Sequence, residues 1–281
     1  MLLLDGISSW FKFKLILFND ISVYPIVCQK EKRQSPIGIC KEKAKSAFIP
    51  PLVFYYYNFK YKVTVENNGQ TLIMKIFDDS CVCELPTVTG GNLDGEYVLD
   101  NIHFHWNSEH TINGKRFPLE SHLVHYNKKC GTLENAMKHP KGLVVMAVMF
   151  EIGHCYNPKL DNILSTTEMI SNKLNKPREI DGGLIIDYLL PQDKNKYYTY
   201  EGSLTVPDFN ETVQWIVFER ILPIGDDQLK RLTKIQLKGS PIKSNTRHLQ
   251  DSNNRHIYYA TDKITAKKIK DYIKEKFRGG C

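Results

Sequence analysis

The sequence lacks the features that divide a chain into several parts. It has no linker rich in proline, glycine or serine, no low-complexity run and no internal repeat. A chain of 281 residues suits one large or two small domains and can bury a substantial core. We therefore predict one domain spanning 24–260, preceded by a divergent N-terminal extension (1–23) and followed by a basic helical tail (261–281).

Continuous apolar sequence is scarce at the N-terminus. Residues 1–23 are apolar only in patches, because Asp5, Lys12 and Lys14 interrupt them. A secretory signal needs an unbroken apolar run of about 7–15 residues followed by small residues, and a membrane-spanning helix needs about 20 apolar residues. The segment matches neither pattern.

Concentrated charge and cysteine motifs are also scarce. The net charge is +7, and the Lys and Arg residues are spread over the chain, which favours a solvated surface over a nucleic-acid-binding one. The seven cysteines are odd in number and match no zinc-ribbon spacing. One basic cluster lies in the predicted tail helix, Ile264–Arg278. A solvated terminal helix is the favoured interpretation of it, and contact with an anionic membrane is the alternative.

Strand signals dominate what is present. Runs rich in β-branched and aromatic residues recur along the chain, and 143–152 is apolar except for Glu151, which is typical of a central strand buried on both faces. Within the domain, helical spacing of apolar residues favours helices at 160–174 and 226–233. The other expected strands are 51–57, 61–65, 71–77, 97–106, 119–126, 197–202 and 213–219. The domain is therefore predicted to be mostly β.

Five of the nine histidines fall between residues 102 and 127. In a strand, His103 and His105 share one face because side chains alternate. Asn113-Gly114 favours a two-residue type I′ turn, and a hairpin without a bulge then places His105 opposite His122 and His103 diagonal to it. Three imidazoles would converge, as in a catalytic zinc site with an open fourth position. Ordinary strand histidines are the alternative interpretation.

Three segments around these histidines carry a family resemblance. HFHW (103–106), SEHT (108–111) and ESHLVHYN (120–127) resemble the signature of the α-class carbonic anhydrases. RQSPI (33–37) and the NxRxxQxxNxR pattern (245–255) also match, although Thr246 stands where Trp is usual. The loop between HFHW and SEHT is shorter than is usual in the family. The resemblance runs from about residue 24 to 255.

The resemblance implies a fold and an activity. The fold would be a large twisted, mainly antiparallel sheet of about ten strands with short peripheral helices. His103, His105 and His122 would bind Zn2+, and the enzyme would hydrate carbon dioxide reversibly to bicarbonate and a proton. The expected partners are these small molecules, with no nucleic acid, and the expected state is a monomer.

The resemblance also assigns roles to residues outside the histidine cluster. Thr205 would orient the attacking hydroxide and donate its own hydrogen bond to Glu109, because an ionised carboxylate only accepts. Gln70 occupies the position where the fastest members have a proton-shuttling histidine. An amide does not titrate near neutral pH, so we expect slowed proton transfer.

Further positions match groups that would support the site. Asn101, Glu120 and a carbonyl near Asn245 would hold the rings of the three histidines, with Asn101 one methylene shorter than the usual Gln. His110 and His125 match histidines that are structural in the family. The apolar wall for carbon dioxide would include Val124, Val145, Leu204 and Trp215, which also suit a core, and Val206 replaces a Thr usual on the polar side.

The family match leaves two further questions. Secreted members often join a cysteine before QSP to one after the LTTPP motif; Cys28 resembles the first, but Phe209 replaces the second. Together with the lack of a signal peptide, this favours a cytoplasmic location over secretion. A catalytically weak, carbonic-anhydrase-related binding module is the alternative function, although such proteins typically lose a zinc histidine and this chain keeps all three.

Overall fold

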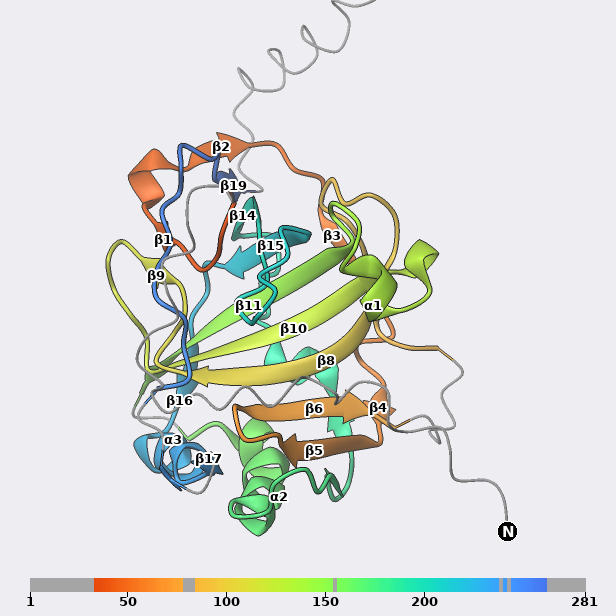
Figure 1. Ribbon diagram of the computed structural model, residues 1–281, viewed down its shortest axis with the longest axis vertical. Helices are drawn as coiled ribbons and strands as arrows, with labels where there is room; N and C mark the ends of the chain where they lie inside the picture. The colour runs from red at the N-terminus through yellow and green to blue at the C-terminus, as the bar shows by residue number, and fades with distance from the viewer. Residues whose placement is uncertain (1–32, 78–83, 154–155, 238–239, 242–243, 262–281) are drawn as a thin grey trace, which may run out of the picture.

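The computed structural model describes residues 33–77, 84–153, 156–237, 240–241 and 244–261 (Figure 1). The predicted N-terminal extension and tail helix lie outside these ranges. Within them the strands are β1 (Gly38–Ile39), β2 (Lys45–Ala47), β3 (Leu52–Tyr55), β4 (Lys60–Tyr61), β5 (Val63–Asn67), β6 (Leu72–Ile76), β7 (Thr87–Gly90), β8 (Tyr97–Trp106), β9 (Thr111–Ile112), β10 (Leu119–Asn127), β11 (Leu143–Ile152), β12 (Arg178–Glu179), β13 (Leu184–Ile185), β14 (Tyr197–Gly202), β15 (Val213–Phe218), β16 (Leu222–Ile224), β17 (Gln236–Leu237), β18 (Ser240–Pro241) and β19 (Tyr258–Ala260).

One large sheet organises the described chain. It holds 13 strands, of which ten follow the order β12-β5-β6-β8-β10-β11-β15-β14-β19-β2, and β3, β7 and β16 join beside them. Within this sheet, the described pairs are antiparallel except β11 with β15 and β16, and β19 with β2. The predicted mostly β fold with a mainly antiparallel sheet is confirmed. The sheet exceeds the predicted ten or so strands because it includes very short ones: the two-residue β12 lies at one edge, and the three-residue β16 pairs with the end of the central strand β11.

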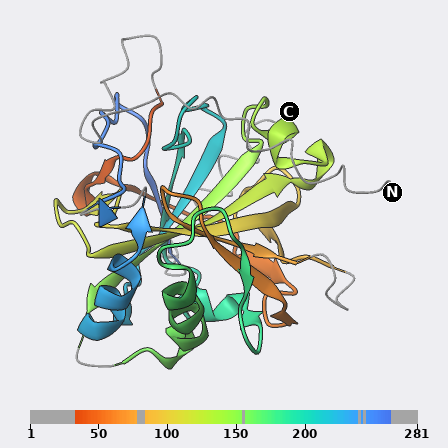
Figure 2. The same ribbon diagram turned by 60° about the horizontal axis from the view of Figure 1, so that its bottom comes forward.

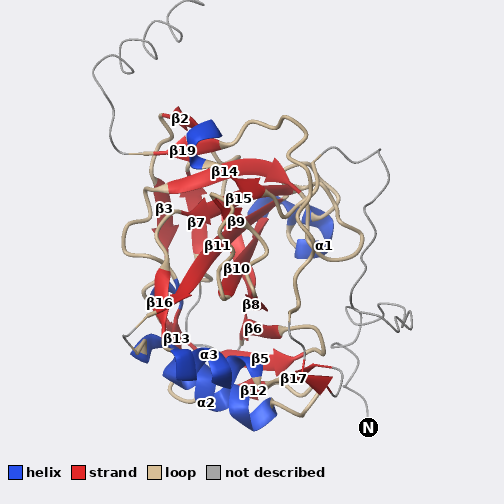
Figure 3. Ribbon diagram, turned by 90° about the vertical axis from the view of Figure 1, so that its left-hand side faces the viewer, coloured by secondary structure: helices blue, strands red, loops and turns tan. Residues whose placement is uncertain are grey.

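The helices are short and peripheral, as predicted. They are α1 (Leu133–Ala136), α2 (Asp161–Ile170) and α3 (Asp226–Thr233), with 3-10 helices η1 (Lys41–Lys43), η2 (Lys128–Cys130), η3 (Pro158–Leu160) and η4 (Ile186–Leu189). Helices α2 and α3 lie side by side at one end of the molecule (Figures 2 and 3). The helix predicted at 160–174 ends at Ile170, because Leu174 forms a bridge to Asn67 and Asn175 donates to the carbonyl of Asn67. None of the helices described here is long and apolar enough to cross a membrane.

Alternation along the central strands separates two hydrophobic cores. In β8, Ile102 and Phe104 enter one core, whereas His103 and His105 point to the opposite face. The central strand β11 supplies both cores, with Val144 and Met146 on one side and Val145 and Ala147 on the other. This explains why β11 is apolar on both faces from Leu143 to Phe150. The alternation also places the histidines on the side of the sheet that carries the second core.

The hairpin that carries the histidines has the predicted turn but not the predicted register. Asn113 and Gly114 have φ of 50° and 75°, as a type I′ turn requires. However, β8 and β10 pair His103 with His122 and His105 with Glu120. The predicted pairing of His105 with His122 is therefore wrong.

Extra residues on one arm of the hairpin cause this shift. Ile112 pairs with Lys115 beside the turn, and the N–H of Ser108 donates to the carbonyl of Phe117. Three residues separate Ser108 from Ile112, but only one separates Lys115 from Phe117. The arm that contains Glu109 thus carries two additional residues. A shift of two keeps every side chain on its original face, so the histidines still converge.

Candidate metal centre

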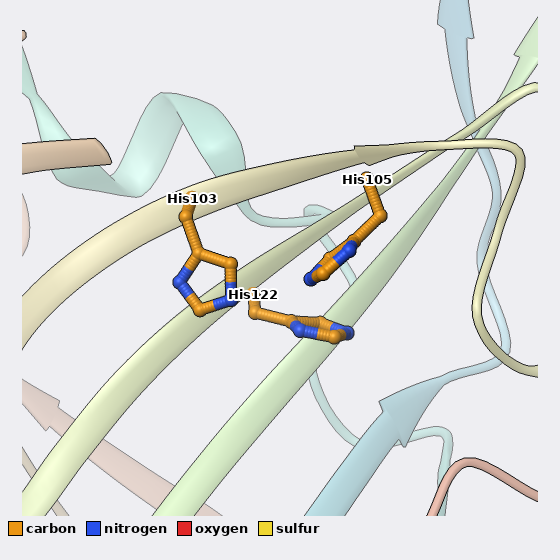
Figure 4. A group of neighbouring side chains, drawn as sticks. All are labelled: His103, His105 and His122. Atoms are coloured by element: carbon orange, nitrogen blue, oxygen red, sulfur yellow. The ribbon is translucent and has the colours of Figure 1, made fainter. Parts of the chain in front are cut away.

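Three imidazoles from β8 and β10 face one another (Figure 4). The ring centroids of His103 and His105 are 5.1 Å apart, those of His103 and His122 5.2 Å, and those of His105 and His122 4.6 Å. One ring nitrogen from each lies within 4.8 Å of the others. Because all three side chains project from adjacent strands of one sheet, the backbone fixes the positions of their Cβ atoms.

Each ring is held through its other nitrogen. Nδ1 of His103 lies 3.0 Å from Oδ1 of Asn101, and Nδ1 of His105 lies 2.9 Å from the carbonyl oxygen of Asn245. Nε2 of His122 lies 2.6 Å from Oε1 of Glu120. All three oxygens are acceptors, so each fixes a ring N–H and leaves the opposite nitrogen with its lone pair. The shorter Asn101, in place of the Gln usual in the family, reaches its histidine.

Burial keeps the cluster in a form suited to metal binding. His103 has a pKa well below its ordinary value because the ring is buried and because His105 and His122 are close. Burial also lowers the pKa of His122, against the opposing effect of Glu120. Metal ions bind the neutral imidazole, so these environments favour the ligating form at neutral pH.

Glu120 connects the cluster to a second buried histidine. Besides His122, it accepts from the backbone N–H of His110 at 2.9 Å and from Nδ1 of His110 at 2.7 Å. Burial raises the pKa of this carboxyl, but His110 and His122 outweigh burial and hold the pKa well below its ordinary value. On the far side of the ring, Nε2 of His110 lies 2.7 Å from the hydroxyl of Tyr200. His110 thus holds the carboxylate of Glu120 in place and does not point into the cluster.

The donor set fits a zinc ion. Nε2 of His105 is buried and has no hydrogen-bond partner, which is costly for a polar atom unless a ligand completes it. Three imidazole nitrogens are a common ligand set of catalytic zinc, and they leave one coordination position open. His110, Glu120 and His122 are also close enough to hold a metal, but N–H groups occupy both oxygens of Glu120.

The carboxylate of Glu109 lies beside the histidine cluster and makes no hydrogen bond to Thr205. Its Oε1 accepts from the backbone N–H of Arg247 at 2.9 Å. Its Oε2 is buried without a hydrogen-bond partner, 3.6 Å from Nε2 of His105 and 3.9 Å from Nδ1 of His122. Thr205 is 8 % exposed and lies in a bend after β14. The expected hydrogen bond from Thr205 to Glu109 is therefore not formed between these described residues.

The expected pocket residues divide between core and surface. Val124, Val145 and Trp215 are buried in the second core, and Leu204 is partly buried against it. The Trp215 ring lies 4.9 Å from the His122 ring, so this apolar side chain borders the cluster directly. Val206 is 43 % exposed and therefore lies on the solvent side.

Gln70 is exposed in the turn between β5 and β6. Its carbonyl oxygen accepts from Nδ2 of Asn245 at 3.0 Å. The side chain of Asn245 also donates to the carbonyl of Phe104 and accepts from the N–H of Trp106. One residue thus joins the turn at Gln70 to the strand that carries His105.

Sequence reasoning missed three residues that act around the cluster. The backbone N–H of Arg247 donates to Glu109, Tyr200 contacts His110, and Asp100 accepts from Asn101. A backbone donor leaves no mark in side-chain identity, and the alternation of a regular strand places Asp100 on the face opposite Asn101. The sequence held a signal for Tyr200 as an aromatic residue in an expected strand, and for Arg247 as part of the NxRxxQxxNxR pattern.

Comparison with known proteins identifies the family. The profile described as eukaryotic-type carbonic anhydrase matches residues 21–261. Similar proteins include carbonic anhydrase 7 of Mus musculus, with 35 % identity over 82 % of this chain and 83 % of that protein. They also include putative carbonic anhydrase 5 of Caenorhabditis elegans, with 32 % identity over 84 % and 78 % of the two chains, and carbonic anhydrase 4 of Rattus norvegicus, with 31 % identity over 82 % and 76 %. With this match and the histidine cluster in hand, the chain belongs to the eukaryotic-type, or α-class, carbonic anhydrases.

Proposed function

We propose that this protein is an active, zinc-dependent carbonic anhydrase that converts carbon dioxide reversibly to bicarbonate and a proton. The observation that carries the proposal is the convergence of three imidazole nitrogens, from the buried His105 and His122 and the half-buried His103, within 4.8 Å of one another. Each of these imidazoles is fixed by an acceptor on its other nitrogen. This arrangement supports a metal-binding role for the three histidines over a purely structural one.

The residues around the cluster have separate tasks in this proposal. His103, His105 and His122 would hold the zinc, which when bound supplies the Lewis acidity that lets water ionise near neutral pH, an effect for which carbonic anhydrase is itself the reference example. Trp215 presents an apolar surface beside His122, where an apolar substrate can lie without competing for hydrogen bonds. Thr205 is the residue expected to orient the attacking oxygen.

The proton that each turnover releases must leave the site. Gln70 is exposed at the turn next to the cluster and cannot carry a proton, because its amide does not titrate near neutral pH. We therefore propose that proton export limits the maximal turnover of this enzyme. Buffer molecules with a pKa near 7 would substitute for the missing carrier.

One observation favours the alternative of a catalytically weak relative. Thr205 does not hydrogen-bond Glu109, whose free oxygen lies toward His105 instead. A protein of this second kind would bind zinc through the same histidines but would hydrate carbon dioxide slowly at every buffer concentration.

Two measurements on the full-length protein separate these possibilities. Zinc content by elemental analysis is expected to be one ion per chain, and stopped-flow hydration of carbon dioxide is expected to show activity that rises with buffer concentration. Zinc without activity would support the weak relative. A protein that binds no zinc after dialysis against excess metal would overturn the proposal.

A further inference from the structure

We propose that Asp100 is a positioning residue for the metal site, and that it acts by fixing the orientation of the Asn101 amide and thereby the tautomer of His103. The inference rests on the proposed function in one respect, which is that His103 is a metal ligand. It goes beyond that function because it assigns a role to a carboxylate outside the cluster.

A β-bulge makes the contact possible. In the pairing of β8 with β10, Asn101 lies opposite Val124 and Leu99 lies opposite His125, so Asp100 is the extra residue. Neighbouring residues of a regular strand point to opposite faces, and their side chains cannot meet. A bulge breaks this alternation and redirects a side chain. Here it brings Oδ2 of Asp100 within 2.8 Å of Nδ2 of Asn101.

The donor and acceptor roles in the two hydrogen bonds are fixed by the carboxylate of Asp100. An ionised carboxylate can only accept a hydrogen bond, so Asp100 must take a proton from the NH2 group of Asn101. The amide oxygen of Asn101 then faces His103, 3.0 Å from Nδ1. That oxygen also only accepts, so Nδ1 must carry the hydrogen and Nε2 must present its lone pair to the cluster.

Without the carboxylate, nothing in this chain of contacts selects the orientation of the amide. The two ends of an Asn side chain have nearly the same shape. A rotated Asn101 would offer an N–H to Nδ1 of His103 and would stabilise the tautomer with hydrogen on Nε2, which leaves no lone pair on the ring nitrogen that faces the cluster. Asp100 is only 20 % exposed at its side chain, and Lys75 lies 4.0 Å away, so the carboxylate has a cation nearby.

The test uses Asp100→Ala and the double variant Asp100→Ala/Asn101→Asp in the full chain. We expect Asp100→Ala to bind zinc about 10-fold more weakly than the parent, the lower end of the effect typical of groups that orient metal ligands. In the double variant, Asp at 101 can only accept, so it fixes the His103 tautomer without Asp100. We therefore expect affinity to return, which would not happen if the first substitution merely damaged the fold. Asp193→Ala, which removes a surface ion pair with Lys196, is the matched control and should bind zinc like the parent.

A second readout does not depend on metal. The 15N chemical shifts of the His103 ring in the metal-free protein report which nitrogen carries the hydrogen. The parent should show hydrogen on Nδ1, and Asp100→Ala should show a mixture. An unchanged tautomer in Asp100→Ala, or a double variant that binds zinc as weakly as the single one, would overturn the role of Asp100. A parent protein that binds no zinc would instead overturn the proposed function, and the ring shifts would still decide the tautomer question.

Discussion

His103 lies directly opposite His122 across the antiparallel pair of β8 and β10. Side chains opposed in this way have Cβ atoms about 4.5–5.5 Å apart, so strand pairing itself brings the two rings together. A slip of one residue would send every ring of one strand to the other face of the sheet. The proposed metal centre therefore depends on strand register more than on any loop.

The first prediction concerns the metal ligands. Replacing His105 by Ala removes one of three nitrogens and leaves the carboxylate of Glu109 3.6 Å from an empty position. We expect the His105→Ala variant to lose zinc and carbon dioxide hydration together, as measured by elemental analysis and stopped-flow kinetics. His139→Ala, which removes an exposed histidine, should retain both. Full zinc stoichiometry in His105→Ala would show that the ion binds elsewhere.

The second prediction concerns Thr205. Valine has nearly the same shape as threonine but lacks the hydroxyl, so Thr205→Val should keep zinc and lose the group expected to orient the attacking oxygen. Losses of orientation suggest a fall in kcat/KM on the order of 100-fold. Thr212→Val is a suitable control, because the Thr212 hydroxyl is buried without a hydrogen-bond partner. Activity of Thr205→Val within a factor of two of the parent would assign the orienting role to another residue.

The elements around the site could be predicted because their signals are local. The alternation of His103 and His105 with Phe104 describes a strand face, and the observed strand β8 spans Tyr97–Trp106 as expected. The turn at Asn113 could also be predicted, since it needs residues that tolerate positive φ.

The register and the bulge could not be predicted, because both depend on how two strands align. The sequence between Ser108 and Ile112 is also compatible with a regular hairpin. Only the observed strand pairing reveals that this arm carries two additional residues. The bulge at Asp100 interrupts the alternation of side chains, so that Asp100 contacts Asn101 instead of pointing to the opposite face. The position of Glu109 is set by a backbone N–H of Arg247, a contact between segments far apart in the chain.

The third prediction concerns stability in acid. Burial lowers the pKa of His125 to about 4, whereas an unfolded chain would show the ordinary value of about 6.5. Between these values the unfolded state binds more protons, so the free energy of unfolding should fall as the pH drops from about 6.5 to about 4. At about 1.4 kcal/mol per pH unit, this histidine contributes a loss of about 3 kcal/mol.

Urea unfolding between pH 8 and pH 4 measures this effect. In His125→Gln the position cannot be protonated, so the variant should be less stable at neutral pH but should lose less stability on acidification than the parent. His139→Gln, at an exposed position, should follow the parent. Equal pH dependence in His125→Gln and the parent would mean that His125 does not resist protonation.

The last prediction concerns the turnover of the proposed enzyme. Each hydration releases a proton, and the exposed side chain at Gln70, next to the segment that holds His105, cannot carry it. A histidine at this position would accept and release protons at neutral pH. Gln70→His should therefore raise kcat in weak buffer, toward the gain of about 100-fold that a positioned acid–base group typically contributes. The value of kcat/KM should stay nearly the same, because the attack on carbon dioxide precedes proton export.

The control Gln192→His adds a histidine at a different exposed position and should change neither constant. Imidazole-type buffers at tens of millimolar should also accelerate turnover of the parent more than that of Gln70→His, as measured by stopped-flow hydration of carbon dioxide. A parent enzyme whose turnover is high and insensitive to buffer would show that another group exports the proton.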